Sequence, residues 1–408
     1  DIKHGACKLL SISIQTTAGM AAKAANATGS AKTAVNLQAA GLPPPSGAMA
    51  TLLKAALPFG DRMQVRAKGF VPNGRLKRQA GLAVLQVAQR VRSVLFESGG
   101  GSSSSSDGSV SGVDRAVAMG WRAVYDIAVR WRQIGEPFDN VWWIDGMPRV
   151  DFEEGFGSHT PILKGQHEAV RYYPQYPRVF ASMKRLAADQ WDLSDEERKE
   201  LNKITDGIAL RKLRGKDDYL VSPCYGVVNG VLEGTRLTVQ DRPPEGVEIS
   251  IRTPLTPSRW ASYDPEMQAG WEVYCNAAYK AGSQPGASKP DRAVVDAALR
   301  LTFYWFNFMP LTRGSAAVGW SMLMALLLAC GYEVTSAPPE GICLDWEAIL
   351  TQKLDDFCSA TSKWLIKSIE VRKVAVEKLP VASEVFSTYR EMFVGLACGV
   401  GDEAVEVA

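Results

Sequence analysis

The sequence has few of the residues on which metal and cofactor sites depend. Its 408 residues include three histidines, and its seven cysteines form no CxxC pair. Zinc sites use three or four protein ligands at recognisable spacings. His159 and His167 lie eight residues apart, with no third ligand at such a spacing. We therefore expect no metal site and no cofactor.

Other catalytic and binding signatures are also missing. There is no G-x-S-x-G motif for a nucleophilic serine, and no glycine-rich stretch ends in the GK[ST] of a phosphate-binding loop. The net charge of +2, from 46 basic and 44 acidic residues, gives no global attraction to nucleic acid or anionic lipid. An odd number of cysteines, several in apolar helical runs, is typical of buried thiols in a reducing compartment. We predict a protein that is not an enzyme and does not bind nucleic acid directly.

The composition is that of a globular protein, with 46% apolar and 22% charged residues. The chain opens at Asp1 without a methionine, so we expect a fragment of a longer protein. A Gly/Ser tract interrupts the helical pattern and has the character of a flexible linker or loop. We predict an N-terminal helical segment over residues 1–98, this linker over 99–112 and a main helical domain over 113–408.

The most apolar stretch runs from Asp291 to Val334. It begins DRAVVDAALRLTFYWFNF, breaks at MPLTRG and resumes as SAAVGWSMLMALLLACGY. Pro310 cannot donate to a helical ladder, so the first helix should end there. Ser315 is then suited to cap the second helix, and Gly331 to end it in a left-handed conformation. The pattern predicts two buried helices joined by a short loop.

The second of these helices raises the question of a membrane span, because no charged residue lies between Arg313 and Glu333. A span needs about 20 apolar residues, and this run is close to that length. It also contains several glycines and serines, and an equally apolar helix precedes it. We favour a buried core helix over a span, and leave peripheral association with a membrane open.

The remainder of the chain is mainly helical in pattern, with one strand-rich exception. Residues 219–253 contain YLVSPCYGVVNG, GTRLTVQD and GVEISIR, short β-prone runs separated by glycine and proline. There is no βαβ alternation and no internal repeat. The sequence therefore predicts a predominantly helical α+β fold, with a central buried helical hairpin and a small antiparallel β-hairpin or meander.

The segment GFGSHTP, residues 155–161, has features of an anion-binding helix N-terminus. Thr160-Pro161 is typical of an N-cap followed by the first helical residue, and free amides with the helix dipole can hold a phosphate or carboxylate. The alternative, which we favour, is an ordinary capped helix, with nearby loop arginines bonding backbone carbonyls or carboxylates. The candidate anion-binding or interaction residues are Ser158, His159, Thr160, Lys164, Arg171, Arg252 and Arg259.

The loop of the central hairpin resembles, in its frame, the catalytic loop of Fic-type nucleotidyl transferases. That family carries HPFx[DE]GNGRxxR between two helices, with an antiparallel flap before them, whereas this chain reads MPLTRGSAAVGW. Met309 stands at the position of the catalytic histidine and Arg313 at that of the metal-binding acid. Gly314 and Ser315 stand at the first two of the four positions that read Gly-Asn-Gly-Arg in that family. Because methionine cannot act as a base, the resemblance implies a Fic-like fold without catalysis.

A second resemblance covers most of the chain. It rests on long strings: RWRQIGEP, VWWID, GFGSHTPILKGQHEAVRYYP, LEGTRLTV, SIRTPLTPSRW, YWFNFMPLTRGSAAVGW and LDWEAIL. These resemble the C-terminal region of the family formed by the plant tetratricopeptide-repeat suppressor of effector-triggered immunity and tetratricopeptide repeat protein 13. The chain departs from that family in lacking the N-terminal repeats and in its Ser-rich insert at 101–106 and Pro-rich loop at 43–45.

This resemblance implies a regulatory scaffold or adaptor. The family's implied role is negative regulation of plant immune responses, through binding of immune regulators, resistance proteins and transcription factors. The implied location is the cytoplasm and nucleus, with some association with internal membranes. The alternatives that remain are an anion- or nucleotide-binding domain and a divergent Fic-type transferase.

Overall fold

The fold is described here from a computed structural model, in which the described residues all belong to one compact unit, Pro45–Gly401. The described ranges are 47–62, 74–97, 111–137, 141–146, 159–163, 176–214, 219–241, 246–252, 258–282, 288–371 and 376–397. Helices make up most of these ranges and strands form small antiparallel sheets, which confirms the predicted α+β class.

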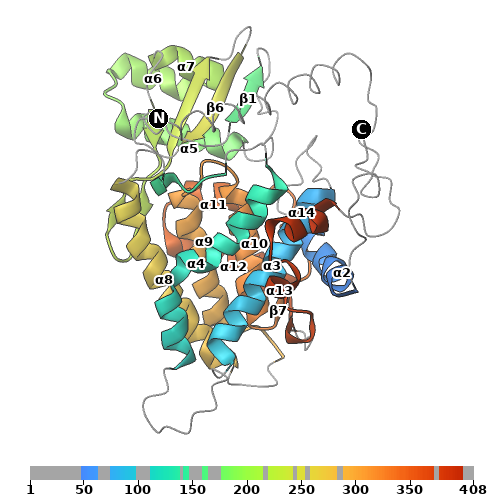
Figure 1. The fold of residues 1–408 in the computed structure, drawn as a ribbon. Coiled ribbons are helices and arrows are strands. Elements are labelled where there is room, and N and C mark those ends of the chain that lie inside the picture. The colour runs from blue at the N-terminus through green and yellow to red at the C-terminus, as the bar shows by residue number, and fades with distance from the viewer. Residues whose placement is uncertain are drawn as a thin grey trace, which may run out of the picture. The chain divides into compact units, whose positions relative to one another are not determined.

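Long helices packed side by side form the main body of the unit (Figure 1). Helix α3 packs against α2, α4 and α10, while α8 packs against α4 and α9. Their bounds are α2 Gly47–Asp61, α3 Gly74–Phe96, α4 Gly112–Gly135, α8 Ser258–Gly282, α9 Arg292–Phe308 and α10 Ser315–Ala329. The predicted linker, residues 99–112, lies almost wholly outside the described ranges. The helices on either side of it, α3 and α4, pack directly on each other.

Helices α9 and α10 form the predicted central hairpin. The Asp291 side chain caps α9 by accepting from the Ala293 amide at 2.8 Å, and α9 ends at Met309, which adopts a left-handed φ of 48°. The prediction that Ser315 caps α10 is wrong, because Ser315 is its first helical residue and Gly314, with φ of 84°, holds the N-cap position. The loop must enter α10 through a left-handed residue, which glycine adopts without strain. Gly331, at φ of 77°, follows α10 as predicted.

Almost every side chain of this hairpin is buried. Gly319 lets the two helices approach closely, because a Cβ there would collide with the rings of Trp305 and Phe306. Helix α10 has 15 residues, fewer than the roughly 20 that a span requires. Across the described ranges, no helix has both the length and the apolar character needed to cross a membrane. The prediction of a buried core helix is therefore confirmed.

A four-stranded antiparallel sheet has the order β1-β6-β5-β2. Strands β2, β5 and β6 fall within the predicted strand region, residues 219–253, and β5 and β6 form a hairpin in which Thr238 pairs with Ser250. The bounds are β1 His159–Leu163, β2 Tyr219–Val221, β5 Arg236–Asp241 and β6 Gly246–Arg252. The fourth strand, β1, comes from a segment for which the sequence predicted a helix.

The predicted helix N-terminus at Thr160-Pro161 is wrong, since both residues lie in β1. Pro161 pairs with Glu248 in a strand at the edge of the sheet. Proline lacks an amide hydrogen and is tolerated in an edge strand because that strand leaves one row of amides without a partner in the sheet. The sequence signal Thr-Pro fits both settings, and pairing with β6 decides between them.

Three helices lie next to this sheet: α5 Tyr176–Gln190, α6 Asp195–Lys203 and α7 Gly207–Arg214 (Figure 1). Leu220 and Leu237 of the sheet share an apolar cluster with residues of α5 and α6 and with Trp346 of α11. Ser194 and Glu197 form a reciprocal capping box at the start of α6. This apolar cluster, which we name the sheet cluster, fixes the sheet against the helical body through α11.

The remaining elements are short and lie mostly after α10. Strands β3 and β4 pair in a small hairpin, and β7 pairs with β8. Their bounds are β3 Cys224–Tyr225, β4 Val231–Leu232, β7 Tyr332–Val334, β8 Ile369–Val371, η1 Ile144–Gly146, α11 Leu344–Thr351, α12 Leu354–Leu365, η4 Ile366–Ser368, η5 Val376–Lys378, α13 Ala382–Val385 and α14 Tyr389–Ala397.

Candidate functional site

The loop between α9 and α10 is held at its start by a buried arginine. Arg259, on α8, is 1% exposed. Its guanidinium donates to the carbonyls of Asn307 and Phe308 at the end of α9, and to those of Glu233 and Gly234. Burial lowers the pKa of this guanidinium from its ordinary value. Arg259 thus fills the role that we favoured for the loop arginines, since it bonds backbone carbonyls.

A separate segment, residues 141–146, covers the loop itself. The Ile144 amide donates to the Pro310 carbonyl at 3.0 Å, and Trp143 forms a bridge with Leu311. Two further bonds of 3.0 Å join Trp142 to Thr312, one from each backbone amide. The Pro310 carbonyl and the Thr312 amide of the loop are therefore used to join two parts of the fold.

Several side chains of the loop are packed against neighbouring residues. Met309 packs against the sheet cluster, and Leu311 and Thr312 are buried. Arg313 is exposed. Gly314 lies so close to Arg132 that an added Cβ would be 2.9 Å from its Nε. The Trp305 indole donates to the Ser315 carbonyl at 2.7 Å. At the positions compared with a Fic catalytic loop, this loop therefore offers neither a base nor an acid.

A second loop, Gly226–Gly230, is held by a buried acid. Glu266, on α8, is 0% exposed, and its carboxylate accepts the amides of Val227, Val228 and Asn229 at 2.8–3.1 Å. The Val227 amide also donates to the Tyr304 hydroxyl at 3.1 Å. A Cβ on Gly226 would collide with the Glu266 carboxylate, so glycine at this position leaves room for it. Sequence reasoning missed this site, because α8 carries several charged residues and nothing local distinguishes Glu266 from Asp264 or Glu272.

The sequence-predicted anion site is only partly covered by the described residues. Lys164, Arg171 and Ser158 lie outside the described ranges. His159 pairs with Ser250, two residues from Arg252 along β6, so the topology brings these two positions to neighbouring strands. Arg259 uses its two terminal guanidinium nitrogens to bond the four carbonyls described above. Anion binding at β1 and β6 stays a prediction, without the helix dipole that first suggested it.

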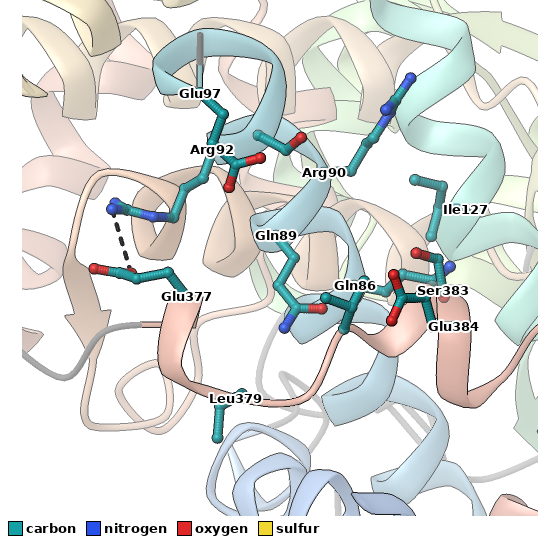
Figure 2. Close-up of a pocket in the computed structure, with 12 residues that line it drawn as sticks. Gln86, Gln89, Arg90, Arg92, Glu97, Ile127, Glu377, Leu379, Ser383 and Glu384 are labelled. Carbon is teal, nitrogen blue, oxygen red and sulfur yellow. Dashed lines mark ion pairs between the residues drawn. The ribbon is translucent and has the colours of Figure 1, made fainter. Parts of the chain in front are cut away.

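A cavity of about 500 Å³ lies between α3 and the segment that contains η5 and α13 (Figure 2). Such a volume lies within the range of ligand pockets. Two polar side chains of α3 join the two walls: Gln89 bonds the Pro380 carbonyl and the Ala382 amide, and Arg92 pairs with Glu377 at 3.3 Å. The cavity therefore lies between two segments that are joined by side-chain bonds.

The described residues contain no group of His, Cys, Asp and Glu placed to hold a metal ion. Burial raises the pKa of the Cys224 and Cys275 thiols to about 12, and both are 0% exposed. Thiols in this state are protonated and inert near neutral pH.

Comparison with known proteins gives two close matches. The chain is 36% identical over 375 residues to Suppressor of RPS4-RLD 1 from Arabidopsis thaliana, covering 79% of this chain and 35% of that protein. It is 28% identical over 331 residues to human Tetratricopeptide repeat protein 13, covering 76% of this chain and 37% of that protein. Both are homologues of this chain. The family resemblance predicted from the sequence strings is therefore confirmed.

The chain spans about a third of the length of each of these curated relatives. No family model matches it. One relative is named for suppression and the other for tetratricopeptide repeats, which is compatible with an adaptor and with a protein that is not an enzyme.

Proposed function

We propose that this chain is a non-catalytic regulatory scaffold domain of a tetratricopeptide-repeat protein, acting as a negative regulator of plant immune responses through protein–protein interactions. The observation that carries the proposal is the closed α9–α10 loop. Arg259 occupies carbonyls at its start, residues 142–144 occupy its backbone, and Met309 stands where a base would be needed. The suppressor name of the Arabidopsis relative supports the regulatory part.

Partners and location follow from the same family. We expect immune regulators, resistance proteins and transcription factors as partners, in the cytoplasm and nucleus. Association with internal membranes would be peripheral, which agrees with the lack of a membrane-crossing helix among the described residues.

A chimera tests the regulatory role. The chimera is full-length Suppressor of RPS4-RLD 1 in which the region that matches this chain is replaced by this chain. It would be expressed in Arabidopsis that lacks the native protein. We expect suppression to be restored to near the level of the intact relative, with a chimera that lacks the region as the negative control. A well-expressed chimera that restores nothing contradicts the proposed role.

A nucleotide assay tests the non-catalytic part. The purified chain would be incubated with labelled nucleotides, Mg²⁺ and extracts of its own cells, and transfer of the label to protein would be measured. Binding of nucleotides to the purified chain would be measured separately by calorimetry. We expect neither binding heat nor labelled protein. Label transfer that disappears in Met309→Ala or Arg313→Ala would replace the scaffold proposal with the transferase alternative.

A further inference from the structure

The hairpin formed by β3 and β4 exposes apolar side chains at an unusual density. Tyr225, Val227, Val228 and Val231 are 41, 62, 51 and 68% exposed. These four, which we name the valine knob, fall within seven consecutive residues. Single exposed apolar residues are ordinary on a protein surface, whereas a group of them marks an interaction site more often.

The backbone under the valine knob is fixed. Glu266 accepts three successive amides of the loop, and the Asn229 side chain donates to the Ser262 carbonyl at 2.8 Å. At the end of the hairpin, Arg259 and the Tyr263 hydroxyl both bond the Glu233 carbonyl. At its start, the Tyr225 amide donates to the Gln352 carbonyl at 3.1 Å. Helix α8 and the segment after α11 thus hold both ends.

This rigidity gives the knob a low entropic cost of binding. A loop that is already in its bound conformation loses little freedom when it meets a partner, so more of the contact energy appears as affinity. Burying a carboxylate is costly unless it is well hydrogen-bonded. Glu266 meets this condition through its three amide bonds, and it fixes the loop beneath valines that are more than half exposed.

The charge of the knob indicates the chemistry of its partner. Residues 224–232 contain no charged side chain. Among the described residues, Lys353 is a basic side chain beside the knob, with its Nζ 5.9 Å from the centre of the Tyr225 ring. Anionic membranes recruit proteins through several Lys or Arg residues, and one is too few. An uncharged knob matches an uncharged apolar groove on a protein.

The knob is too small to hold two copies of this chain together by itself. A standard interface buries roughly 800 Å² per partner, and four side chains with these exposures supply only a few hundred Å². That area is typical of a central anchor within a larger interface, where a few residues carry most of the binding energy.

We propose that the valine knob is the anchor through which this domain inserts into an apolar groove on a partner protein. This deepens the proposed function and rests on it, because it assigns the scaffold's partner contact to one preformed hairpin. The contact is apolar, so its strength varies little with ionic strength.

Site-specific crosslinking in the whole protein, in its own cells, tests the proposal. A photo-crosslinking amino acid would replace Val228, with Val381, which is 45% exposed and lies before α13, as the control position. We expect a protein adduct from position 228 and none from 381. The same protein should copurify equally at about 0.1 and 0.5 M NaCl, since apolar contacts are not screened.

A matched pair of variants then measures dependence on the knob. V227S/V228S/V231S removes its apolar surface without adding charge, and V273S/V381S changes two valines that are both 45% exposed elsewhere. We expect recovery of the crosslinked partner to fall at least about tenfold in the first variant and less than about twofold in the second. Circular dichroism and thermal melting would establish that both are folded.

The other outcomes overturn the proposal. Adducts between two copies of the chain would assign the knob to self-association. Knob-dependent sedimentation with phosphatidylcholine–phosphatidylserine vesicles would assign it to a membrane. Undiminished recovery by V227S/V228S/V231S would place the partner on another surface and leave the proposed function standing. If the wild-type protein binds no partner by any surface, both the knob proposal and the proposed scaffold function are wrong.

Discussion

The α9–α10 loop and the β3–β4 hairpin are each held by a buried charged residue of α8, a cation for the first and an anion for the second. Arg259 donates to backbone carbonyls at the start of the first loop, and Glu266 accepts backbone amides in the second. The first loop turns its apolar residues inward, where Leu311 is 2% exposed. The second turns its valines outward.

This difference separates two uses of rigidity. In the α9–α10 loop, the buried charge completes the hydrogen bonding of a helix end within the core, so the loop serves the fold. In the hairpin, the buried charge fixes a turn whose valine side chains face solvent and do not pack in the core. Arg259 also bonds the Glu233 and Gly234 carbonyls at the end of the hairpin, so it contributes to both regions. The predictions below test this division from the largest expected effect to the smallest.

The largest loss of stability should follow Arg259→Met. The substitution removes the buried guanidinium from four backbone carbonyls, one of which, that of Glu233, still accepts from the Tyr263 hydroxyl. Bonds to a charged group are individually strong. We expect the free energy of unfolding to fall by about 3–5 kcal/mol in urea denaturation. Arg90→Met, the same change at an exposed position of α3, is the control and should change it by less than about 0.5 kcal/mol. Equal effects would show that Arg259 is not a structural clamp.

Glu266→Gln should have a smaller and more local effect. A glutamine keeps the shape of the side chain but offers one neutral oxygen to three amides, so we expect a loss of about 1–3 kcal/mol. Hydrogen exchange of the Val228 and Asn229 amides should become faster, whereas amides of α9 should be unaffected. Glu272→Gln, at an exposed position of the same helix, is the matched control. If exchange at the two loop amides is unchanged, Glu266 does not fix the hairpin.

The first region was largely predictable from sequence and the second was not. Pro310 and Gly331 mark the ends of the hairpin helices locally, and the apolar run between them predicts burial. The β1 strand was missed because its partner β6 lies far along the chain, and Thr160-Pro161 fits a helix start as well as an edge strand. The role of Glu266 depends on a loop some 37 residues away coming to lie over one helix face. Local sequence carries no record of that contact.

A thiol in the second region gives a pH-dependent effect. Burial raises the pKa of Cys224 to about 12, above that of an unfolded thiol near 9. The folded state therefore keeps its proton while the unfolded state loses it, so this contribution is intact below pH 9 and is lost as the pH rises toward 12. Between pH 7 and 10 we expect the free energy of unfolding to fall by about 1 kcal/mol through this group. Cys224→Ala should remove that part of the pH dependence, measured by urea denaturation at both pH values, whereas an unchanged slope would show that the thiol is not held protonated.

The smallest effect should come from V227S/V228S/V231S, which alters only side chains that already face solvent. Because each is more than half exposed, little apolar burial is lost and the free energy of unfolding should change by less than about 0.5 kcal/mol. Val294→Ser and Val295→Ser, at 0% exposed positions of α9, provide the contrast and should each cost about 2–4 kcal/mol. Urea denaturation of all three variants makes the comparison directly. A large loss in the triple variant would mean that the valines support the fold, and that the hairpin, like the α9–α10 loop, is held for structure.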